Sequence, residues 1–272
     1  MYLAMAQMMV KLTPEENLGT ILNYIKEAKG LGADMVAFGE MIACDYDINK
    51  FPEFAMEETS TFLTEIAKAA KEQNIFVVAG SVPEKENGNI YNTTFVYDNN
   101  GVLAAKHRKV HLFDIDVKGG QYFKESDMLT AGNKTTRFST PWGEMGICIC
   151  YDIRFPEFVR MTTLGGNAEP LFGVIVPGAF NMTTGPAHWQ MNFRMRAMEN
   201  QIYMAGVSPA RDTQGTYTAW GHSLSVDPWG AVMSEMDETE GLVLVEWKKE
   251  RQEQVRNEFP LLKHRRADLY SL

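Results

Sequence analysis

Cysteine is scarce in this sequence of 272 residues, which contains only Cys44, Cys148 and Cys150. Three cysteines cannot all pair within one chain, and their spacing does not match that of a zinc site. We therefore expect reduced thiols, no bound metal and a cytoplasmic location. Because free cysteine often packs as a small hydrophobe, Cys148 is expected in the core, whereas the role of Cys44 stays open.

Long apolar runs and basic runs are also missing. No apolar stretch approaches the roughly 20 residues that cross a membrane, and residues 1–6 lack the basic segment that opens a secretory signal peptide. The formal net charge is −9, and the first run of basic residues, at 263–266, is short. These features predict a soluble protein that binds neither membranes nor nucleic acids.

The sequence does contain an alternation of strand and helix patterns. Residues 13–16 carry a capping-box signature, after which apolar residues recur at helical spacing to about residue 30. Asn99–Gly101 is a typical hairpin turn. Alternating strands and helices predict a layered α/β fold with mixed sheets, and the lack of a linker predicts a single domain over residues 1–272.

Periodicity also places each element along the chain. We predict strands at residues 2–10, 35–38, 75–79, 90–97, 102–105, 135–139, 144–150, 172–176, 202–207, 221–226, 231–234 and 242–246. We predict helices at residues 14–30, 59–73, 156–164, 187–200 and 248–257. Residues 114–133 form a long polar connection, and such a segment inside a compact domain is usually functional.

The segment Gly146–Glu157 changes from a strand pattern to a helix start. Apolar residues alternate up to Cys150, and Pro156 then stands where the first turn of a helix begins. A cysteine at this point is presented at the carboxyl end of a strand, where open α/β folds place their chemistry. We therefore expect the functional site to form around Cys150.

Two charged residues also follow predicted strands, Glu40 after the second strand and Lys109 after the hairpin. A thiol needs a base or a lowered pKa before it attacks well. Glu40 can exchange protons, Lys109 can stabilise negative charge, and Glu125 on the long polar connection can support either. Taken singly, Glu40 is more often a polar strand end and Lys109 a solvated cation, and spacing alone does not join them.

Three motifs around these residues are specific. The sequences Cys-Tyr-Asp-Ile-Arg-Phe-Pro-Glu at residues 150–157, His-Arg-Lys-Val-His-Leu-Phe at 107–113 and Phe-Lys-Glu-Ser at 123–126 strongly resemble the nitrilase superfamily of carbon–nitrogen hydrolases. The resemblance runs along almost the whole chain. It implies a four-layer α-β-β-α sandwich with two mixed sheets, which forms a homodimer or a larger homo-oligomer.

The resemblance also implies the roles of the site residues. Glu40 is the expected general base, Lys109 stabilises the oxyanion, Glu125 is a second glutamate and Cys150 is the nucleophile. Gly39 is a departure, because the superfamily usually has proline before this glutamate. A glycine gives the backbone before Glu40 more freedom.

Further motifs, at residues 177–189, 208–212, 219–223 and 227–230, resemble the ω-amidase branch of the superfamily. This branch hydrolyses the distal amide of 2-oxoglutaramate and 2-oxosuccinamate, which carry a carboxylate at the far end.

A substrate of this kind needs an anchor for its carboxylate. Arg154 can grip one bidentately, and Thr184 can add a hydroxyl. The alternative for Arg154 is a structural ion pair with Asp152 or Glu157.

The expected mechanism is covalent. Cys150 attacks the amide carbon while Glu40 takes the thiol proton, and Lys109 with the backbone N–H of Tyr151 holds the oxyanion. Glu40 then protonates the departing ammonia and activates the water that hydrolyses the thioester, so no cofactor is required. The histidines His188 and His222 are expected to be structural.

Other functions stay open. A nitrilase, an N-carbamoyl amide hydrolase and an amidase of deaminated glutathione share the same machinery. A catalytically silent interaction protein is a further alternative, against which the joint presence of Glu40, Lys109, Glu125 and Cys150 argues. The expected partners are therefore a small-molecule amide and further copies of the chain.

Overall fold

The computed structural model describes residues 1–116, 118, 122–165 and 170–269. Its first large sheet contains β1 (Tyr2–Gln7), β2 (Met35–Phe38), β3 (Phe76–Val78), β4 (Val82–Glu86), β5 (Asn89–Tyr97), β6 (Leu103–Arg108) and β15 (Gly241–Glu246). Its second contains β9 (Thr136–Thr140), β10 (Gly143–Ile147), β11 (Gly173–Pro177), β12 (Tyr203–Val207), β13 (Leu224–Val226) and β14 (Val232–Glu235). A small sheet pairs β7 (Asp114–Asp116) with β8 (Tyr122–Lys124).

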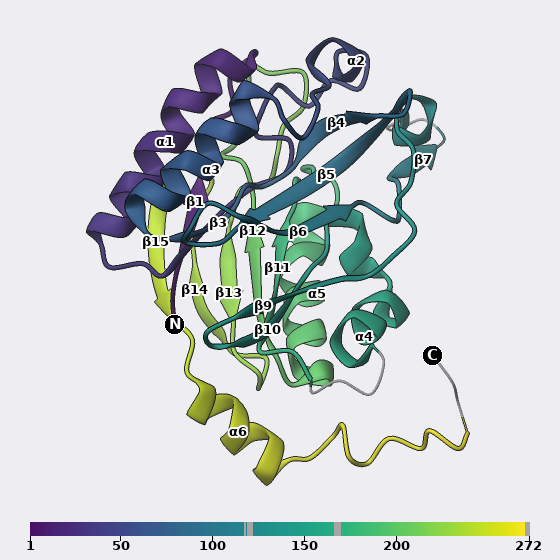
Figure 1. Cartoon of the computed structure of the whole chain (residues 1–272). Helices are drawn as coiled ribbons and strands as arrows, with labels where there is room; N and C mark the ends of the chain where they lie inside the picture. Colours follow the sequence, from purple (N-terminus) through teal and green to yellow (C-terminus); the bar gives the residue numbers. More distant parts are fainter. Residues whose placement is uncertain (117, 119–121, 166–169, 270–272) are drawn as a thin grey trace.

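Helices lie outside the two large sheets (Figure 1). The α-helices are α1 (Pro14–Gly30), α2 (Phe51–Phe54), α3 (Thr61–Gln73), α4 (Pro156–Leu164), α5 (Gly185–Asn200) and α6 (Lys249–Glu258), and the 3₁₀ helices are η1 (Glu125–Asp127) and η2 (Cys150–Arg154). Within the described ranges, none of the helices is both long and apolar enough to cross a lipid bilayer.

Alternating side chains on the strands define four layers. In β1, Ala4 packs in a core with α1 and α3, whereas its neighbour Leu3 packs between the two sheets. In β11, Val174 packs against α4 and α5, whereas Ile175 lies between the sheets. The order is therefore helices, sheet, sheet, helices, and the predicted α-β-β-α sandwich is confirmed.

Each predicted strand and helix is present, with ends displaced by a few residues at most. The expected capping box of α1 is present at Thr13 and Glu16. The sequence prediction missed α2, the small β7–β8 sheet and β4. The last carries Pro83 and three charged residues but pairs with β5 at the edge of its sheet, where proline and charge are tolerated.

The strand directions bring several chain segments to one edge. The strands β1, β2 and β3 run parallel, as do β10, β11 and β12. Because β6 is antiparallel to β5, which is antiparallel to β3, the carboxyl ends of β2 and β6 lie at the same edge. The segments that follow β2, β6, β10 and β11 therefore meet.

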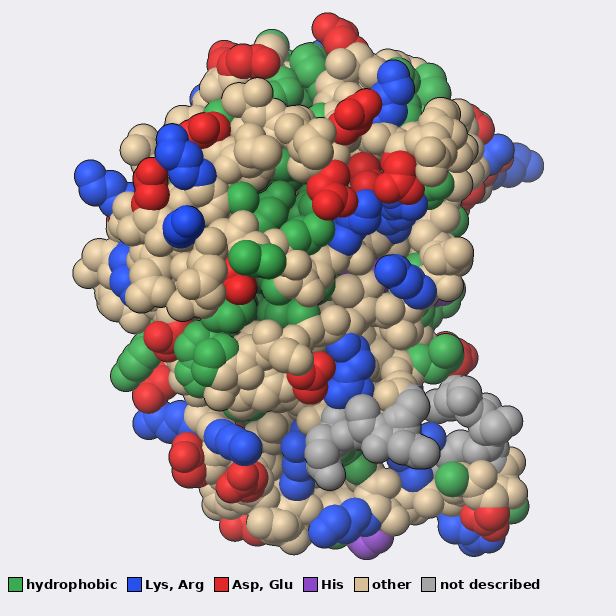
Figure 2. Space-filling model, viewed as in Figure 1, with side chains coloured by type: hydrophobic (Ala, Val, Ile, Leu, Met, Phe, Trp, Pro, Cys, Tyr) green, Lys and Arg blue, Asp and Glu red, His purple; other side chains and the backbone are tan. Residues whose placement is uncertain are grey.

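The outer surface carries charges of both signs. Figure 2 shows acidic and basic side chains interspersed over the face that it presents, without a large area of one sign. The net charge of −9 is therefore not gathered into a single patch on this face.

Candidate active site

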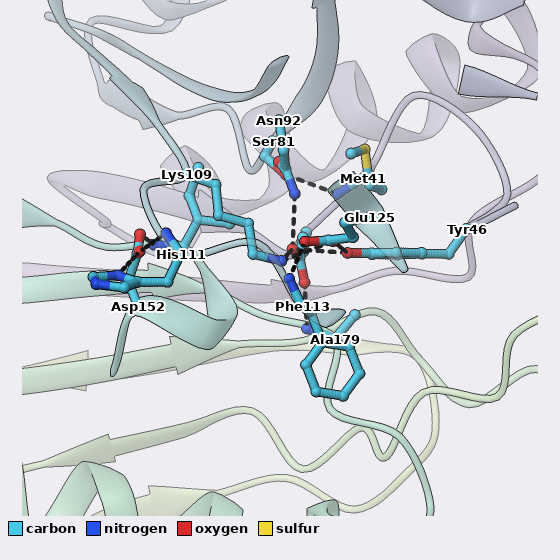
Figure 3. A network of polar contacts seen from close by, with 12 residues as sticks. Met41, Tyr46, Ser81, Asn92, Lys109, His111, Phe113, Glu125, Asp152 and Ala179 are labelled. Carbon is cyan, nitrogen blue, oxygen red and sulfur yellow. Dashed lines mark hydrogen bonds and ion pairs between the residues drawn. The ribbon is translucent and has the colours of Figure 1, made fainter. Parts of the chain in front are cut away.

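Four predicted site residues meet at the shared strand edge, and Figure 3 labels two of them, Lys109 and Glu125. Glu40 and Lys109 follow β2 and β6, Glu125 begins η1 and Cys150 begins η2. The Nζ atom of Lys109 lies 2.9 Å from Glu40 Oε1 and 2.8 Å from Glu125 Oε1. The Glu40 carboxylate and the Ala179 N–H both act on the pKa of the Cys150 thiol, so the thiol lies beside them. The fold thus gathers the thiol, the cation and both carboxylates.

The two oxygens of Glu40 have different surroundings. Oε1 accepts hydrogen bonds from Tyr46 at 3.0 Å, Asn92 at 2.8 Å and Lys109 at 2.9 Å. Oε2 accepts one from the Ala179 N–H at 3.0 Å. Since the same N–H also acts on the Cys150 thiol, we infer that Oε2 is the oxygen on the cysteine side. It is therefore the better placed of the two to exchange a proton with sulfur.

Cys150 has an unusual backbone. The strand β10 ends at Ile147, so the cysteine does not end the strand as predicted but begins the 3₁₀ helix η2. Its φ of 43° lies in the left-handed region, where non-glycine residues are uncommon. A sharp turn of this kind presents the side chain away from the sheet, much as the nucleophile turn of enzymes with the α/β-hydrolase fold does.

Gly39 is explained by space and not by conformational freedom. A Cβ atom built at this position would lie 2.7 Å from the Pro209 backbone nitrogen and 2.8 Å from the carbonyl carbon of Ser208. Real Cβ atoms do not approach backbone so closely, so a larger residue requires one segment to move. The glycine lets the chain after β12 pass directly beside the residue that precedes Glu40.

Burial controls the electrostatics of the site. Glu40 and Glu125 are 0% exposed, Lys109 is 1% exposed and Cys150 is 8% exposed. Burial, aided by the Glu40 charge and opposed by Lys109, raises the pKa of Cys150 well above its usual value, so the resting group is a neutral thiol. Attack by this sulfur therefore requires a base.

The cation and the second carboxylate are also perturbed. Burial acts to lower the pKa of Lys109, but the charges of Glu125 and Glu40 outweigh it and hold that pKa well above its usual value. Burial raises the pKa of Glu125, against the opposing effect of Lys109. Lys109 thus stays charged beside the sulfur, where it can stabilise developing negative charge.

A pocket opens over the thiol. It is lined by Tyr46, Lys109, Phe113, Cys150, Tyr151, Arg154, Ala179, Phe180, Asn181, Thr184 and Tyr217. The pocket therefore contains the candidate nucleophile Cys150 and Tyr151, whose backbone N–H is the expected oxyanion donor. It also contains both candidate carboxylate anchors, Arg154 and Thr184.

Arg154 does not form the alternative ion pair. Among the described residues it is bonded to no carboxylate; it lies 2.8 Å from His188 Nδ1, and its guanidinium carbon lies 4.4 Å from the centre of the Phe180 ring. Asp152 is instead occupied by His107 and by a second histidine of the same motif. The structural ion-pair interpretation is therefore wrong.

The remaining predicted residues have the following places. Thr184 is the N-cap of α5, and its hydroxyl donates to Asn181 at 3.0 Å. His188 contacts Arg154, whereas the His222 ring stacks on Trp220. Both histidines thus act on neighbours of the site and not on the thiol.

The other two cysteines are separate from the reacting group. Cys148 packs in the core between the second sheet and its helices, as predicted, and Cys44 is buried beside Met41 and Phe51. All three cysteines are unpaired.

Sequence analysis missed three residues of the polar network: Tyr46, Asn92 and Ala179. Asn92 had a signal, because it is an amide in the interior of a predicted strand, and its side chain is fully buried in β5. Tyr46 and Ala179 lie in loops without periodicity, and Ala179 contributes its backbone, which no side-chain pattern identifies.

Comparison with known proteins decides the family. The carbon-nitrogen hydrolase model matches residues 2–257. This chain belongs to the carbon–nitrogen hydrolase family. The resemblance to the nitrilase superfamily is thereby confirmed, and the protein is an amidase of that superfamily.

The family includes close relatives over the full length. The carbon–nitrogen hydrolase chain is 41% identical to omega-amidase NIT2 of Xenopus tropicalis over 99% of its own length and 96% of the relative's. It is 38% identical to human omega-amidase NIT2 with the same coverage. The crystal structure of Saccharomyces cerevisiae Nit3, a member of branch 10 of the nitrilase superfamily, is 34% identical with a TM-score of 0.89, covering 98% of this chain and 96% of Nit3.

Proposed function

We propose that this amidase is an ω-amidase. It cleaves the terminal amide of a dicarboxylate monoamide, such as 2-oxoglutaramate or 2-oxosuccinamate, to the acid and ammonia. The relatives named omega-amidase support the substrate class, as they match nearly the whole chain at about 40% identity. The observation that carries the proposal is the position of Arg154 in the pocket.

Arg154 offers a cation to the far end of such a substrate. It lines the same pocket as Cys150, and it forms no ion pair with a carboxylate in the described part of the chain. Its Nε is buried and has no hydrogen-bond partner among the described residues. A guanidinium with free donors in a partly desolvated site is suited to bind a carboxylate bidentately.

The start of α5 adds to this anion site. Thr184, its N-cap, lines the pocket, and its side chain donates to Asn181 and caps no helix N–H. The first N–H groups of a helix of this length carry a partial positive charge that favours an anion. The carboxylate thus binds between Arg154 and α5, with the amide at Cys150.

Acylation begins with the neutral thiol. Cys150 forms a bond to the amide carbon while its proton passes to Glu40 Oε2. The negative charge that develops on the carbonyl oxygen is stabilised by Lys109 and by the Tyr151 N–H. The carbon–nitrogen bond then breaks, the leaving nitrogen takes the proton from Glu40, and ammonia departs to leave a thioester.

Deacylation uses the same base. Glu40 takes a proton from a water molecule as its oxygen attacks the thioester carbon. The carbon–sulfur bond breaks, the sulfur recovers its proton from Glu40, and the acid is released. Lys109 again faces the oxyanion. Each proton that Glu40 takes it also returns, so the cycle needs no cofactor.

The test is ammonia release from 2-oxoglutaramate, measured beside succinamate, glutamine, a simple nitrile and an N-carbamoyl amino acid. We expect turnover of 2-oxoglutaramate and succinamate, and loss of all turnover in Cys150→Ala with the fold retained. Turnover of only a nitrile or an N-carbamoyl compound would assign one of the alternative activities. Turnover that survives in Cys150→Ala would remove the covalent mechanism.

A further inference from the structure

The hydroxyl of Tyr46 lies between the two carboxylates of the site. Its oxygen is 3.0 Å from Glu40 Oε1 and 2.5 Å from Glu125 Oε1, and Figure 3 shows the ring pointing into this network. The residue comes from the loop after β2, only six positions beyond Glu40. It therefore contacts both glutamates without belonging to either of their motifs.

One proton serves two acceptors here. Burial and the charges of Glu125 and Glu40 raise the pKa of Tyr46 well above its usual value, so the hydroxyl keeps its proton. A single phenol can donate fully to only one carboxylate at a time. Lys109 does not resolve the competition, because it also contacts both glutamates.

The hydrogen bonds assign different tasks to the two oxygens of Glu40. Oε1 is occupied by three donors, from Tyr46, Asn92 and Lys109. Among the described residues, Oε2 on the Cys150 side accepts a hydrogen bond from the Ala179 N–H alone. Once a proton arrives on Oε2, the carboxyl is neutral and Oε1 becomes a weaker acceptor, whereas Glu125, which is paired with Lys109, remains an acceptor beside the same hydroxyl.

We propose that Tyr46 is a positioning residue that holds Glu40 Oε1 away from the sulfur. It shares its hydrogen bond between Glu40 and Glu125 and gives it wholly to Glu125 whenever Glu40 is protonated. This proposal deepens the mechanism proposed above. The proton of Tyr46 never leaves its oxygen; only the acceptor changes. Glu125 thus acts as the alternate acceptor that keeps the phenol satisfied through both half-reactions.

The packing of the Tyr46 ring fixes the aim of its hydroxyl. The ring stacks on Tyr217 with centroids 4.8 Å apart and meets Phe51 edge-on at 5.6 Å. Phenylalanine at position 46 keeps these ring contacts and removes only the hydroxyl. The charged and titratable groups around the hydroxyl are Glu40, Glu125, Lys109, Cys150 and Tyr217.

The first test compares Tyr46→Phe with Tyr217→Phe. The second tyrosine lines the same pocket, but among the described residues its hydroxyl donates to the Ala179 carbonyl and to no carboxylate, so its acid limb, and not its kcat, serves as the reference. In Tyr46→Phe we expect kcat to fall 10- to 100-fold with KM within threefold. Because a phenol donor favours the charged carboxylate, its loss should move the acid limb of kcat/KM upward by about one pH unit. The acid limb of Tyr217→Phe should stay in place.

A second variant should shift the acid limb of kcat/KM in the opposite direction. Site-specific 3-fluorotyrosine at position 46 keeps the shape and makes the hydroxyl a stronger donor, so the acid limb should move to lower pH. This comparison also serves if Tyr46→Phe fails to fold. Acid limbs that coincide with that of the unchanged protein, or that move the same way in both variants, would overturn the proposal.

Alkylation of Cys150 by iodoacetamide gives a readout that needs no substrate. The pH dependence of its rate should move in the same directions as that of turnover, since transfer of the thiol proton to Glu40 precedes both. If the ω-amides are not hydrolysed but these shifts appear, the substrate proposal fails and the role of Tyr46 stands. Shifts in neither readout remove the role of Tyr46 alone.

Discussion

The guanidinium of Arg154 is held by an imidazole and by aromatic rings. Its ring contacts, with Phe180 at 4.4 Å and Tyr151 at 5.7 Å, orient the side chain without neutralising it. A structural arginine in a protein interior normally satisfies a carboxylate or a set of carbonyls. This one keeps its charge available in the pocket beside Cys150.

We predict that Arg154→Met raises KM for 2-oxoglutaramate by about 10- to 100-fold, because a charge-assisted hydrogen bond is lost. For a neutral amide such as butyramide, KM should change less than threefold. Steady-state kinetics on both compounds check this, with the exposed Arg194→Met on α5 as the control. Equal increases for both compounds would mean that Arg154 only supports the pocket wall.

A second prediction concerns Gly39, whose missing Cβ leaves room for the backbone at Pro209. Gly39→Ala forces these two segments apart, and overpacking of this kind costs about 1–3 kcal/mol. We expect a lower free energy of unfolding in urea and a lower kcat, because Glu40 is the next residue.

The control for this substitution is Gly19→Ala. Gly19 lies in α1 with nothing within 4 Å of a built Cβ. Alanine there favours the helix by up to about 1 kcal/mol. The two glycine-to-alanine substitutions should therefore change the free energy of unfolding in opposite directions. No change in that free energy for Gly39→Ala would contradict the spatial explanation.

Among the elements, the short helix η2 connects the segment that carries Lys109 with the turn that carries Cys150. Its residue Asp152 accepts hydrogen bonds from His107 and His111 and from the backbone N–H of Val110, and it also closes the turn at Ile149. The lysine segment after β6 and the cysteine turn are thus fastened to one buried carboxylate. The distance between Lys109 and Cys150 depends on that carboxylate.

We predict that Asp152→Asn lowers the free energy of unfolding at pH 7 by about 3–5 kcal/mol, as the loss of a buried charge partner does. Burial acts to raise the pKa of Asp152, but the hydrogen bonds from His107 and His111 outweigh it and hold the pKa below its usual value of 3.8. A depressed carboxyl pKa contributes stability above the unfolded value and loses it as the pH falls toward the folded value.

The difference in the free energy of unfolding between Asp152→Asn and the unchanged protein should therefore narrow as the pH drops below about 4. Urea unfolding at several pH values measures it. The exposed Asp127→Asn is the control and should change stability by less than about 1 kcal/mol at any pH. A difference that is constant with pH would show that the charge of Asp152 is not what stabilises the fold.

The same elements explain how far the sequence predicts this protein. Helix and strand positions follow from periodicity. Cys150, Lys109 and Glu40 were candidates because each comes shortly after a strand, and the resemblance to the nitrilase superfamily joined them into one site. Tyr46 was not predictable, because its two hydrogen-bond partners depend on how the loop after β2 meets η1. Contacts of this kind are set by packing between segments and leave no local pattern.

At the scale of the whole molecule, the site spans two layers. Glu40 and Lys109 follow strands of the first sheet, whereas Cys150 and Ala179 follow strands of the second. The side chains between the sheets, among them Leu3 and Ile175, set the spacing of the two halves. The predicted homodimer stays a prediction, although α5 exposes apolar side chains such as Met191 on the outside.

Because the site needs both layers in place, recovery of catalytic activity during refolding indicates when the two sheets have docked. The hydrogen bond from the Ala179 N–H to Glu40 joins residues 139 positions apart in the chain. Contacts between such distant residues form late in folding. On dilution from urea, we expect far-ultraviolet circular dichroism to recover before amide hydrolysis does. Simultaneous recovery would mean that the sheets dock as they form. If activity recovers later than the circular dichroism, the two sheets form first and dock afterwards.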